Sequence, residues 1–215
     1  MFYFQYVMKT EKLTGFIKQI QPTNHIILFY DDSETKRRIL YDYISDGLAK
    51  GKGIIYICSD ESPDEVRDGL ISYGIDVEPN ERSEILLIKN FEWYIEKGNA
   101  DTLKIINRMN DAYRKFSEKG LGMRITGEMS CFFKQNKVRE LLRYEYALHK
   151  VLTIPIDAIC AYNLQSIVDA GYTDVIMPLV RAHGKAIFTA QGGSIIVEPN
   201  DVEDTDLERL LEIEI

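Results

Sequence analysis

The sequence has few of the residues that mark secreted, fibrous or membrane-spanning proteins. Its 215 residues include three cysteines, six prolines and fourteen glycines, too few for a disulfide scaffold or a collagen-like chain. Three cysteines cannot all pair within one chain, and Cys58 and Cys160 lie in apolar runs, so we expect a cytoplasmic location. No apolar run approaches the roughly 18 residues of a membrane span. The first residues show no signal-peptide pattern, so we expect them in the mature protein.

Basic charge is also scarce. The chain has 26 Lys and Arg residues against 34 Asp and Glu residues, a formal net charge of -8. Positions 191–215 hold eight of the acids and one base, so the rest of the chain is nearly neutral. A nucleic-acid-binding surface needs clustered Lys and Arg, and we therefore expect no direct nucleic-acid partner. The acidic segment is expected to be a solvated tail, with a partner-binding segment as the alternative.

Apolar runs of strand length alternate with helix-period segments from about residue 25 onward, which is typical of βαβ units. The predicted strands are Ile26–Tyr30, Gly53–Cys58, Ile85–Lys89, Met123–Thr126, Pro155–Tyr162 and Lys185–Ala190. The predicted helices are Ser33–Lys50, Pro63–Tyr73, Thr102–Lys119, Asn136–Leu152 and Asp174–His183. Glycines 192 and 193 separate two β-rich runs and predict an antiparallel C-terminal edge.

These patterns predict an α/β fold of three layers, in which helices flank a mainly parallel sheet. We expect one domain at 25–198, an N-terminal extension at 1–24 and the acidic tail at 199–215. Ser62 before Pro63 predicts a capping box with Glu65 at the start of the second helix. Ser33 and Asp101 are candidate caps for their own helices.

The familiar catalytic and metal-binding motifs are missing. The segment Gly47–Gly53 has a Gly-Lys pair, but no Ser or Thr follows the pair and the segment precedes a strand, so it is no Walker A motif. No His-Glu-x-x-His or Cys-x-x-Cys spacing supports a zinc site. Ser130 lacks the Gly-x-Ser-x-Gly context of hydrolases. We therefore predict no catalytic residue and no metal site, and the sequence leaves the identity of any cofactor unknown.

Polar residues follow several of the predicted strands. In an open parallel sheet, ligands bind beyond the carboxyl ends of the strands, where helix N-termini present free N–H groups. Tyr30, Asp31, Ser59 and Glu128 stand at or just after such ends, and Tyr162 ends the fifth strand. For the carboxylates, helix capping is the structural alternative.

The helix predicted at 136–152 carries a carboxylate on its apolar side. At about 100° per residue, Glu145 falls at the centre of a face of leucines and valine, with His149 one turn later. A carboxylate that faces a sheet must be paired, hydrogen-bonded or protonated. We expect its neighbours to include His149, Glu128 and Tyr162, in either a ligand pocket or a structural pair. His25 is expected at the other end of the sheet, stabilising a turn.

Five segments are jointly similar to one known family. They read HIILFYDD at 25–32, GKGIIYICSDESPDEVRDGLISYGIDV at 51–77, RITGEMS at 124–130, RYEYALHK at 143–150 and AICAYN at 158–163. In this order they resemble the MEDS family, the methanogen and methylotroph sensory domain, over about residues 20–190. By motif, the resemblance matches His25, Tyr30, Glu128, Glu145, Cys160 and Tyr162 to family positions. The resemblance implies a RecA-like or KaiC-like fold without a phosphate loop. It also implies that the domain senses small molecules such as hydrocarbon derivatives.

We therefore favour a non-catalytic sensory domain that binds a small molecule at the carboxyl ends of the strands and signals through protein contacts. The candidate ligand-binding residues are Tyr30, Asp31, Ser59, Glu128, Glu145, His149, Cys160 and Tyr162. A divergent nucleotide-binding protein or ATPase and an interaction scaffold without ligand are the alternatives. The expected partners are a small-molecule ligand and a signalling protein, without a membrane, and a homo-oligomer is compatible with the sequence.

Overall fold

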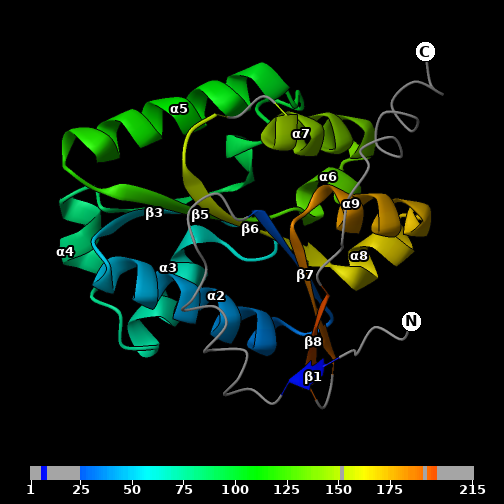
Figure 1. The fold of residues 1–215 in the computed structure, drawn as a ribbon, viewed down its shortest axis with the longest axis horizontal. Coiled ribbons are helices and arrows are strands. Elements are labelled where there is room, and N and C mark those ends of the chain that lie inside the picture. The colour runs from blue at the N-terminus through cyan, green and yellow to red at the C-terminus, as the bar shows by residue number, and fades with distance from the viewer. Residues whose placement is uncertain (1–5, 9–24, 151–152, 191–192, 198–215) are drawn as a thin grey trace.

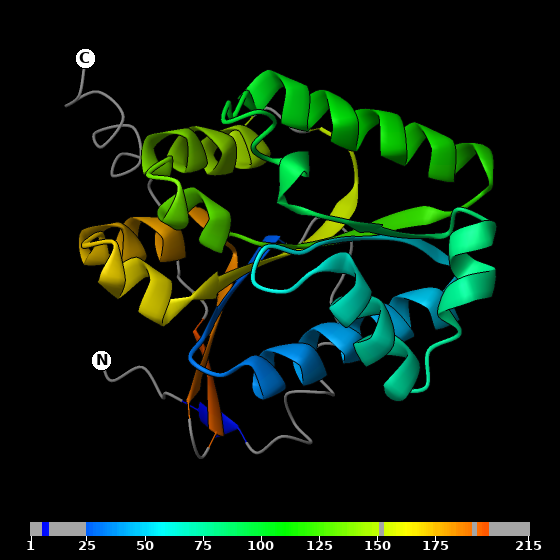
Figure 2. The same cartoon turned by 180° about the vertical axis from the view of Figure 1, so that it is seen from behind.

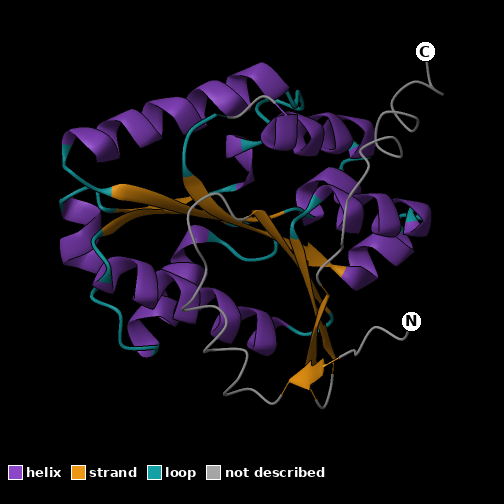
Figure 3. Cartoon of the chain, viewed as in Figure 1, coloured by secondary structure: helices purple, strands orange, loops and turns teal. Residues whose placement is uncertain are grey.

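A computed structural model describes residues 6–8, 25–150, 153–190 and 193–197, and in these residues eight strands form one sheet (Figures 1 and 3). The strands are β1 Tyr6–Met8, β2 His25–Tyr30, β3 Lys52–Ile57, β4 Leu86–Lys89, β5 Gly122–Glu128, β6 Ile156–Asn163, β7 Lys185–Ala190 and β8 Gly193–Val197. Their order across the sheet is β1-β8-β7-β2-β6-β5-β3-β4. The pairs from β7 to β4 are parallel, and β8 runs antiparallel to β7 and β1. The predicted parallel sheet with an antiparallel edge is confirmed.

Helices cover both faces of the sheet, as Figures 1 and 2 show from opposite sides. They are α2 Ser33–Ala49, α3 Pro63–Ser72, α4 Val77–Arg82, α5 Thr102–Glu118, α6 Ser130–Lys134, α7 Val138–Lys150, α8 Leu164–Asp169 and α9 Ile176–Ala182, with 3-10 turns η1 Phe91–Trp93 and η2 Thr173–Val175. Helices α2 and α3 pack on one face, here named the α2 face, and α5, α7 and α9 pack on the other, the α7 face. The fold is therefore the predicted three-layer α/β arrangement.

Strand alternation separates the core into two clusters. Successive side chains of a strand point to opposite faces, so Ile27 and Phe29 of β2 join the α7 face while Leu28 and Tyr30 join the α2 face. The central strands β2, β3, β5 and β6 are almost completely buried, as expected for a parallel sheet with helices on both sides.

The helix N-caps predicted from the sequence are the observed ones except in α2, where the capping residue lies one position earlier. Ser62 and Glu65 form the predicted capping box of α3, and the Asp101 side chain accepts a hydrogen bond from the Lys104 N–H at the start of α5. The cap of α2 is Asp32, which accepts from the Thr35 N–H at 2.7 Å, so the cap lies one residue before Ser33.

The structure contains elements that the sequence analysis did not anticipate. Helices α4, α6 and α8 have only five or six residues, which is less than two turns and too short for a helical period to register. Strand β1 lies in the predicted N-terminal extension, and its Val7 is paired with Ile195 of β8. The predicted domain bounds stay a prediction, and the acidic tail from position 199 lies outside the described residues. Across the described part of the chain, every helix falls short of the length and apolar character that a membrane crossing requires.

Candidate functional site

Six of the eight predicted site residues occupy two separate polar networks on opposite faces of the sheet. Glu128, at the end of β5, points to the α2 face and contacts Tyr56 and Lys36. Glu145, on α7, points to the α7 face and contacts Tyr162. The expectation that Glu128 is a neighbour of Glu145 is therefore wrong, because the sheet lies between the two carboxylates.

The Glu128 carboxylate is fully buried and accepts four hydrogen bonds. The Lys36 Nζ donates at 2.5 Å and the Tyr56 hydroxyl at 2.8 Å to Oε1. The backbone N–H groups of Ser59 and Asp60 each donate at 2.7 Å to Oε2. Because every acceptor position is occupied, this carboxylate ties β5 to α2 and to the turn after β3.

Lys36 is also fully buried, and its ammonium group lies between two carboxylates. It contacts Oε2 of Glu61 at 2.6 Å in addition to Glu128. Burial opposes its charge, but Glu128 and Glu61 raise the pKa of Lys36 above its usual value. The lysine nearest the start of α2 is thus held as the centre of an internal ion-pair network.

The Asp60 carboxylate is the acceptor for three further side chains at this edge of the sheet. Its carboxylate accepts hydrogen bonds from the hydroxyls of Tyr30 and Ser130 and from Nζ of Lys134. Although burial opposes it, these contacts lower the pKa of Asp60. Of the other predicted residues here, Asp31 is exposed to solvent, and the Ser59 hydroxyl donates to the backbone oxygen of Glu128.

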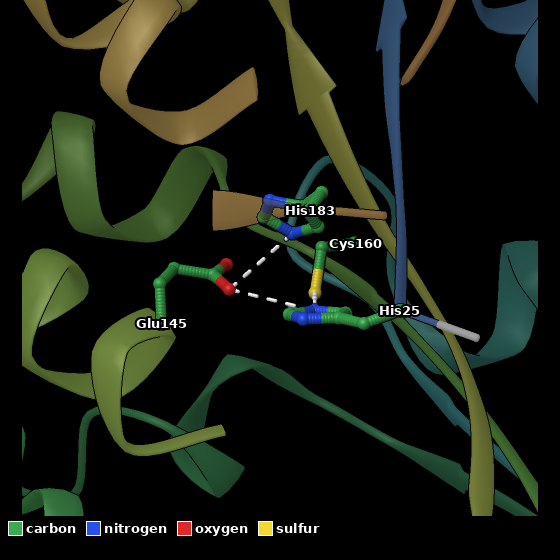
Figure 4. A group of neighbouring side chains, drawn as sticks. All are labelled: His25, Glu145, Cys160 and His183. Atoms are coloured by element: carbon green, nitrogen blue, oxygen red, sulfur yellow. Dashed lines mark hydrogen bonds and ion pairs between the residues drawn. The ribbon is translucent and has the colours of Figure 1, made fainter. Parts of the chain in front are cut away.

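The second network surrounds Glu145 beneath helix α7 (Figure 4). Its Oε2 lies 3.5 Å from Nε2 of His25 and 3.4 Å from Nε2 of His183, and its Oε1 accepts a hydrogen bond from the Tyr162 hydroxyl. The Sγ of Cys160 lies 3.1 Å from Nε2 of His25. We name His25, Glu145, Cys160 and His183 the α7 cluster.

Four different elements bring the α7 cluster together. His25 begins β2, Glu145 lies on α7, Cys160 lies in the middle of β6, and His183 directly follows α9. Register explains one contact, because His25 pairs with Ala158 in the parallel β2–β6 ladder, two residues before Cys160. The cluster thus lies over the middle of β6 and at the start of β2. The predicted ligand site at the carboxyl ends of the strands stays a prediction.

Burial without full hydrogen bonding sets the electrostatics of the α7 cluster. Desolvation raises the pKa of Glu145 to about 7, although Tyr162 and Cys160 act in the opposite direction. Desolvation also lowers the pKa of His183 to about 4 and holds that of His25 well below its usual value. Burial therefore favours the uncharged form of all three groups, the neutral imidazoles and the protonated carboxyl.

Among the residues that the structure describes, several atoms of this network have no hydrogen-bond partner. They are Oε2 of Glu145, Nε2 of His183 and Nδ1 of His25, all buried. Native proteins rarely leave such groups unpaired, and an exception points to a functional or ligand-binding role. Glu145 points inward and contacts Tyr162, as the sequence predicts, whereas no pattern in the sequence indicates that His25 and His183 lie beside it.

His25 therefore differs from its expected role in a turn. Its backbone oxygen does accept a hydrogen bond from the Gly184 N–H, but its ring lies 4.0 Å from the His183 ring and contacts Cys160. His149, which was expected beside Glu145, is exposed and acts electrostatically on both histidines.

Two surface grooves lie away from both networks. One of about 300 Å³ runs between β4 and α5 and includes Trp93 and Arg108. The other, of about 280 Å³, includes Arg139 and Tyr172 at the start of α7. None of the eight predicted site residues lines either groove.

Solved structures of similar fold come from the archaeon Pyrococcus horikoshii. A KaiC-like protein is 13% identical with a TM-score of 0.57, over 84% of this chain and 80% of its own. An uncharacterized protein, solved in complex with an unknown peptide, is also 13% identical with a TM-score of 0.62, over 87% of this chain and 88% of its own. At this identity the likeness shows the fold alone, and it confirms the expected KaiC-like architecture.

A comparison with curated proteins gives no match. The sequence profile of the MEDS family, described as the methanogen/methylotroph, DcmR sensory domain, matches residues 24–183. The match covers well over half of the chain and includes all four residues of the α7 cluster. This chain is therefore a member of the MEDS family of sensory domains.

Proposed function

We propose that this chain is a sensory domain that binds a small ligand at the α7 cluster and signals to a partner protein through α7 and α9. The observation that carries the proposal is the group of buried, unpaired polar atoms around Glu145. A purely structural Glu–Tyr pair needs only Oε1 of Glu145, which the Tyr162 hydroxyl already satisfies. Within the described part of the chain, Oε2 of Glu145 and the facing Nε2 of His183 have no such partner.

The arrangement offers a way to transmit binding to the surface. Glu145 lies on α7 and His183 at the end of α9, while His25 and Cys160 lie on central strands. A ligand that bridges these groups connects two surface helices to the sheet at one point. Binding then stabilises one packing of α7 and α9 relative to others, and a partner that contacts these helices reads the difference.

A ligand screen by thermal unfolding tests this function. The panel contains C1–C4 alcohols, aldehydes, thiols and halides, the class expected from the family resemblance, and separately Zn²⁺ and other divalent ions. A ligand at 100 times its dissociation constant stabilises by about 2.7 kcal/mol, which for a chain of this size shifts the Tm by about 5–11 °C. We expect such a shift for wild type and a much smaller one for Glu145→Gln.

The matched control is Glu140→Gln, a carboxylate on the same helix that contacts Lys137 at the surface. This variant should respond like wild type. Hydrogen exchange in the presence of the stabilising probe should slow in α7 and α9. If no probe gives a shift that depends on Glu145, the α7 cluster is no input site and the domain is an interaction scaffold filled by its own side chains.

Nucleotide binding is the second candidate, because the fold is KaiC-like. The internal network at the start of α2 argues against it, since Lys36 is already bound to Glu61 and Glu128 and the preceding loop carries Asp31 and Asp32 instead of a glycine-rich phosphate cradle. Titration with a fluorescent ATP analogue and Mg²⁺ should show no saturable binding. Saturable binding that Lys36→Met abolishes would favour the nucleotide-binding function.

A further inference from the structure

The α7 cluster combines four metal-ligating side chains within a small volume. The ligand atoms of His25, Glu145, Cys160 and His183 all lie within 4.8 Å of one another. Bonds of 2.0–2.3 Å from a tetrahedral zinc ion place ligand atoms about 3.3–3.8 Å apart. The two nitrogen-to-carboxylate distances, 3.5 and 3.4 Å, fall in this range, and the 3.1 Å from His25 to Cys160 is slightly below it.

The hydrogen bonds around the cluster orient its lone pairs inward. Nδ1 of His183 lies 2.7 Å from the Leu179 backbone oxygen, which fixes the proton on Nδ1 and leaves the Nε2 lone pair facing Glu145. Metal-binding histidines typically donate their second N–H to a carbonyl in this way. The Tyr162 hydroxyl holds Oε1 of Glu145, so that Oε2 faces both imidazoles.

Two acceptors that face each other at this distance require a cation between them. An ionised Glu145 and the Nε2 lone pair of His183 repel, and a proton or a metal ion removes that repulsion. A proton satisfies one contact. A divalent ion contacts both groups together with His25 and a thiolate at Cys160, and the two anionic ligands neutralise its charge in a buried environment.

We infer that the α7 cluster binds one divalent transition-metal ion of the zinc class, with Nε2 of His25, Nε2 of His183, Sγ of Cys160 and one oxygen of Glu145 as ligands. This inference rests on the proposed function, because it names the ligand of the same input site. Two imidazoles, one thiolate and one carboxylate favour zinc and similar ions over calcium or magnesium, which prefer oxygen ligands.

The burial of the ligands indicates a closed site that responds to occupancy. Glu145, Cys160 and His183 are at most 3% exposed, and only the His25 side chain, at 16%, reaches solvent. Four protein ligands complete a tetrahedral shell, which is typical of sites without an open coordination position. His25 lies where an ion enters, and binding fixes α7 and the end of α9 to β2 and β6.

Cobalt substitution tests this site directly. Protein freed of metal by chelation is titrated with Co²⁺ and followed by absorption spectroscopy. We expect one equivalent to bind, with the intense visible bands of four-coordinate cobalt and a near-ultraviolet thiolate-to-cobalt band. Zn²⁺ should displace the cobalt and abolish both signals. Binding without a thiolate band, or the absence of stoichiometric binding, would overturn the inference.

Two cysteines of equal burial provide a matched pair of variants. Cys160→Ala removes a ligand and should lose the thiolate band, while Cys131→Ala changes a cysteine that is likewise 3% exposed on the same face but outside the cluster and should keep it. Tyr162→Phe removes only the hydrogen bond to Glu145 and should weaken Zn²⁺ binding by about 10- to 100-fold. If Cys160→Ala retains wild-type affinity and spectrum, the site is elsewhere.

The same proteins separate this inference from the proposed function. Organic probes that stabilise through Glu145 without any metal binding would leave the sensory site in place and overturn its metal ligand. Zinc binding at the cluster that leaves hydrogen exchange in α7 and α9 unchanged would establish the metal site and overturn the sensory mechanism.

Discussion

The buried ion pair of Lys36 and Glu128 should contribute strongly to the free energy of unfolding, and this contribution can be measured directly. Both side chains are fully buried, and Nζ lies 2.5 Å from Oε1. Removing one member of such a pair leaves an uncompensated buried charge and costs about 3–5 kcal/mol. We expect Glu128→Leu to lose at least this much stability, because it also removes the acceptor for Tyr56 and for two backbone N–H groups.

The assays are urea unfolding and thermal unfolding followed by circular dichroism, for Glu128→Leu, Lys36→Met and the double variant. In a chain of this size, 3–5 kcal/mol corresponds to a Tm decrease of about 6–20 °C. The double variant should be less destabilised than the sum of the single variants by about 1–3 kcal/mol, because the two side chains interact directly. The exposed pair of Glu78 and Arg82 is the control, and its removal should cost no more than about 0.5 kcal/mol. Additive single effects, or single effects below about 1 kcal/mol, would refute the reasoning.

Three further measurements test other parts of the structure. A Cβ at Gly53 would lie 2.2 Å from the Phe116 ring, so Gly53→Ala should cost about 1–3 kcal/mol in urea unfolding, and an unchanged midpoint would contradict this packing. All three cysteines are buried and burial raises the pKa of two of them to about 12, so a thiol reagent should label the native protein far more slowly than the unfolded one. Equal rates would mean that the thiols are accessible. The pKa of Asp60 is lowered in the folded state, so its stabilising contribution is present above its unfolded pKa of about 3.9 and is lost as the pH falls below that value. Asp60→Asn should therefore flatten the acid side of a curve of stability against pH. An unchanged acid side would show that other groups control it.

Much of the fold could be predicted because its central strands are short apolar runs between capped helices. The runs that became β2, β3 and β6 are bounded within two residues of their observed ends. The inward position of Glu145 followed from helical periodicity alone, since a single carboxylate on an apolar face is visible in the sequence. By contrast, β5 alternates, with Arg124, Thr126 and Glu128 on one face and apolar Met123 and Ile125 on the other, but the strand sequence did not tell which helices cover which face.

The α7 cluster escaped prediction for a different reason. His25 and His183 stand at opposite ends of the matched segment, and no local spacing links either of them to Cys160 or Glu145. Their meeting depends on the strand order, which places β2 between β6 and β7, and on the register of β2 against β6. His25, Glu145 and Cys160 were named from the sequence as candidates or family matches, but their convergence with His183 depends on the folded sheet.

Strand β2 touches both polar networks, because His25 at its start belongs to the α7 cluster and Tyr30 at its end donates to Asp60 on the other face. Four residues lie between them, so that five steps of extended chain, about 17 Å, separate the two. These four residues are fully buried and paired on both sides. Because β2 is hydrogen-bonded to β6 on one side and to β7 on the other, the spacing between His25 and Tyr30 is fixed by three strands together. One strand thus anchors the α7 cluster on one face of the sheet and a hydroxyl partner of Asp60 on the opposite face.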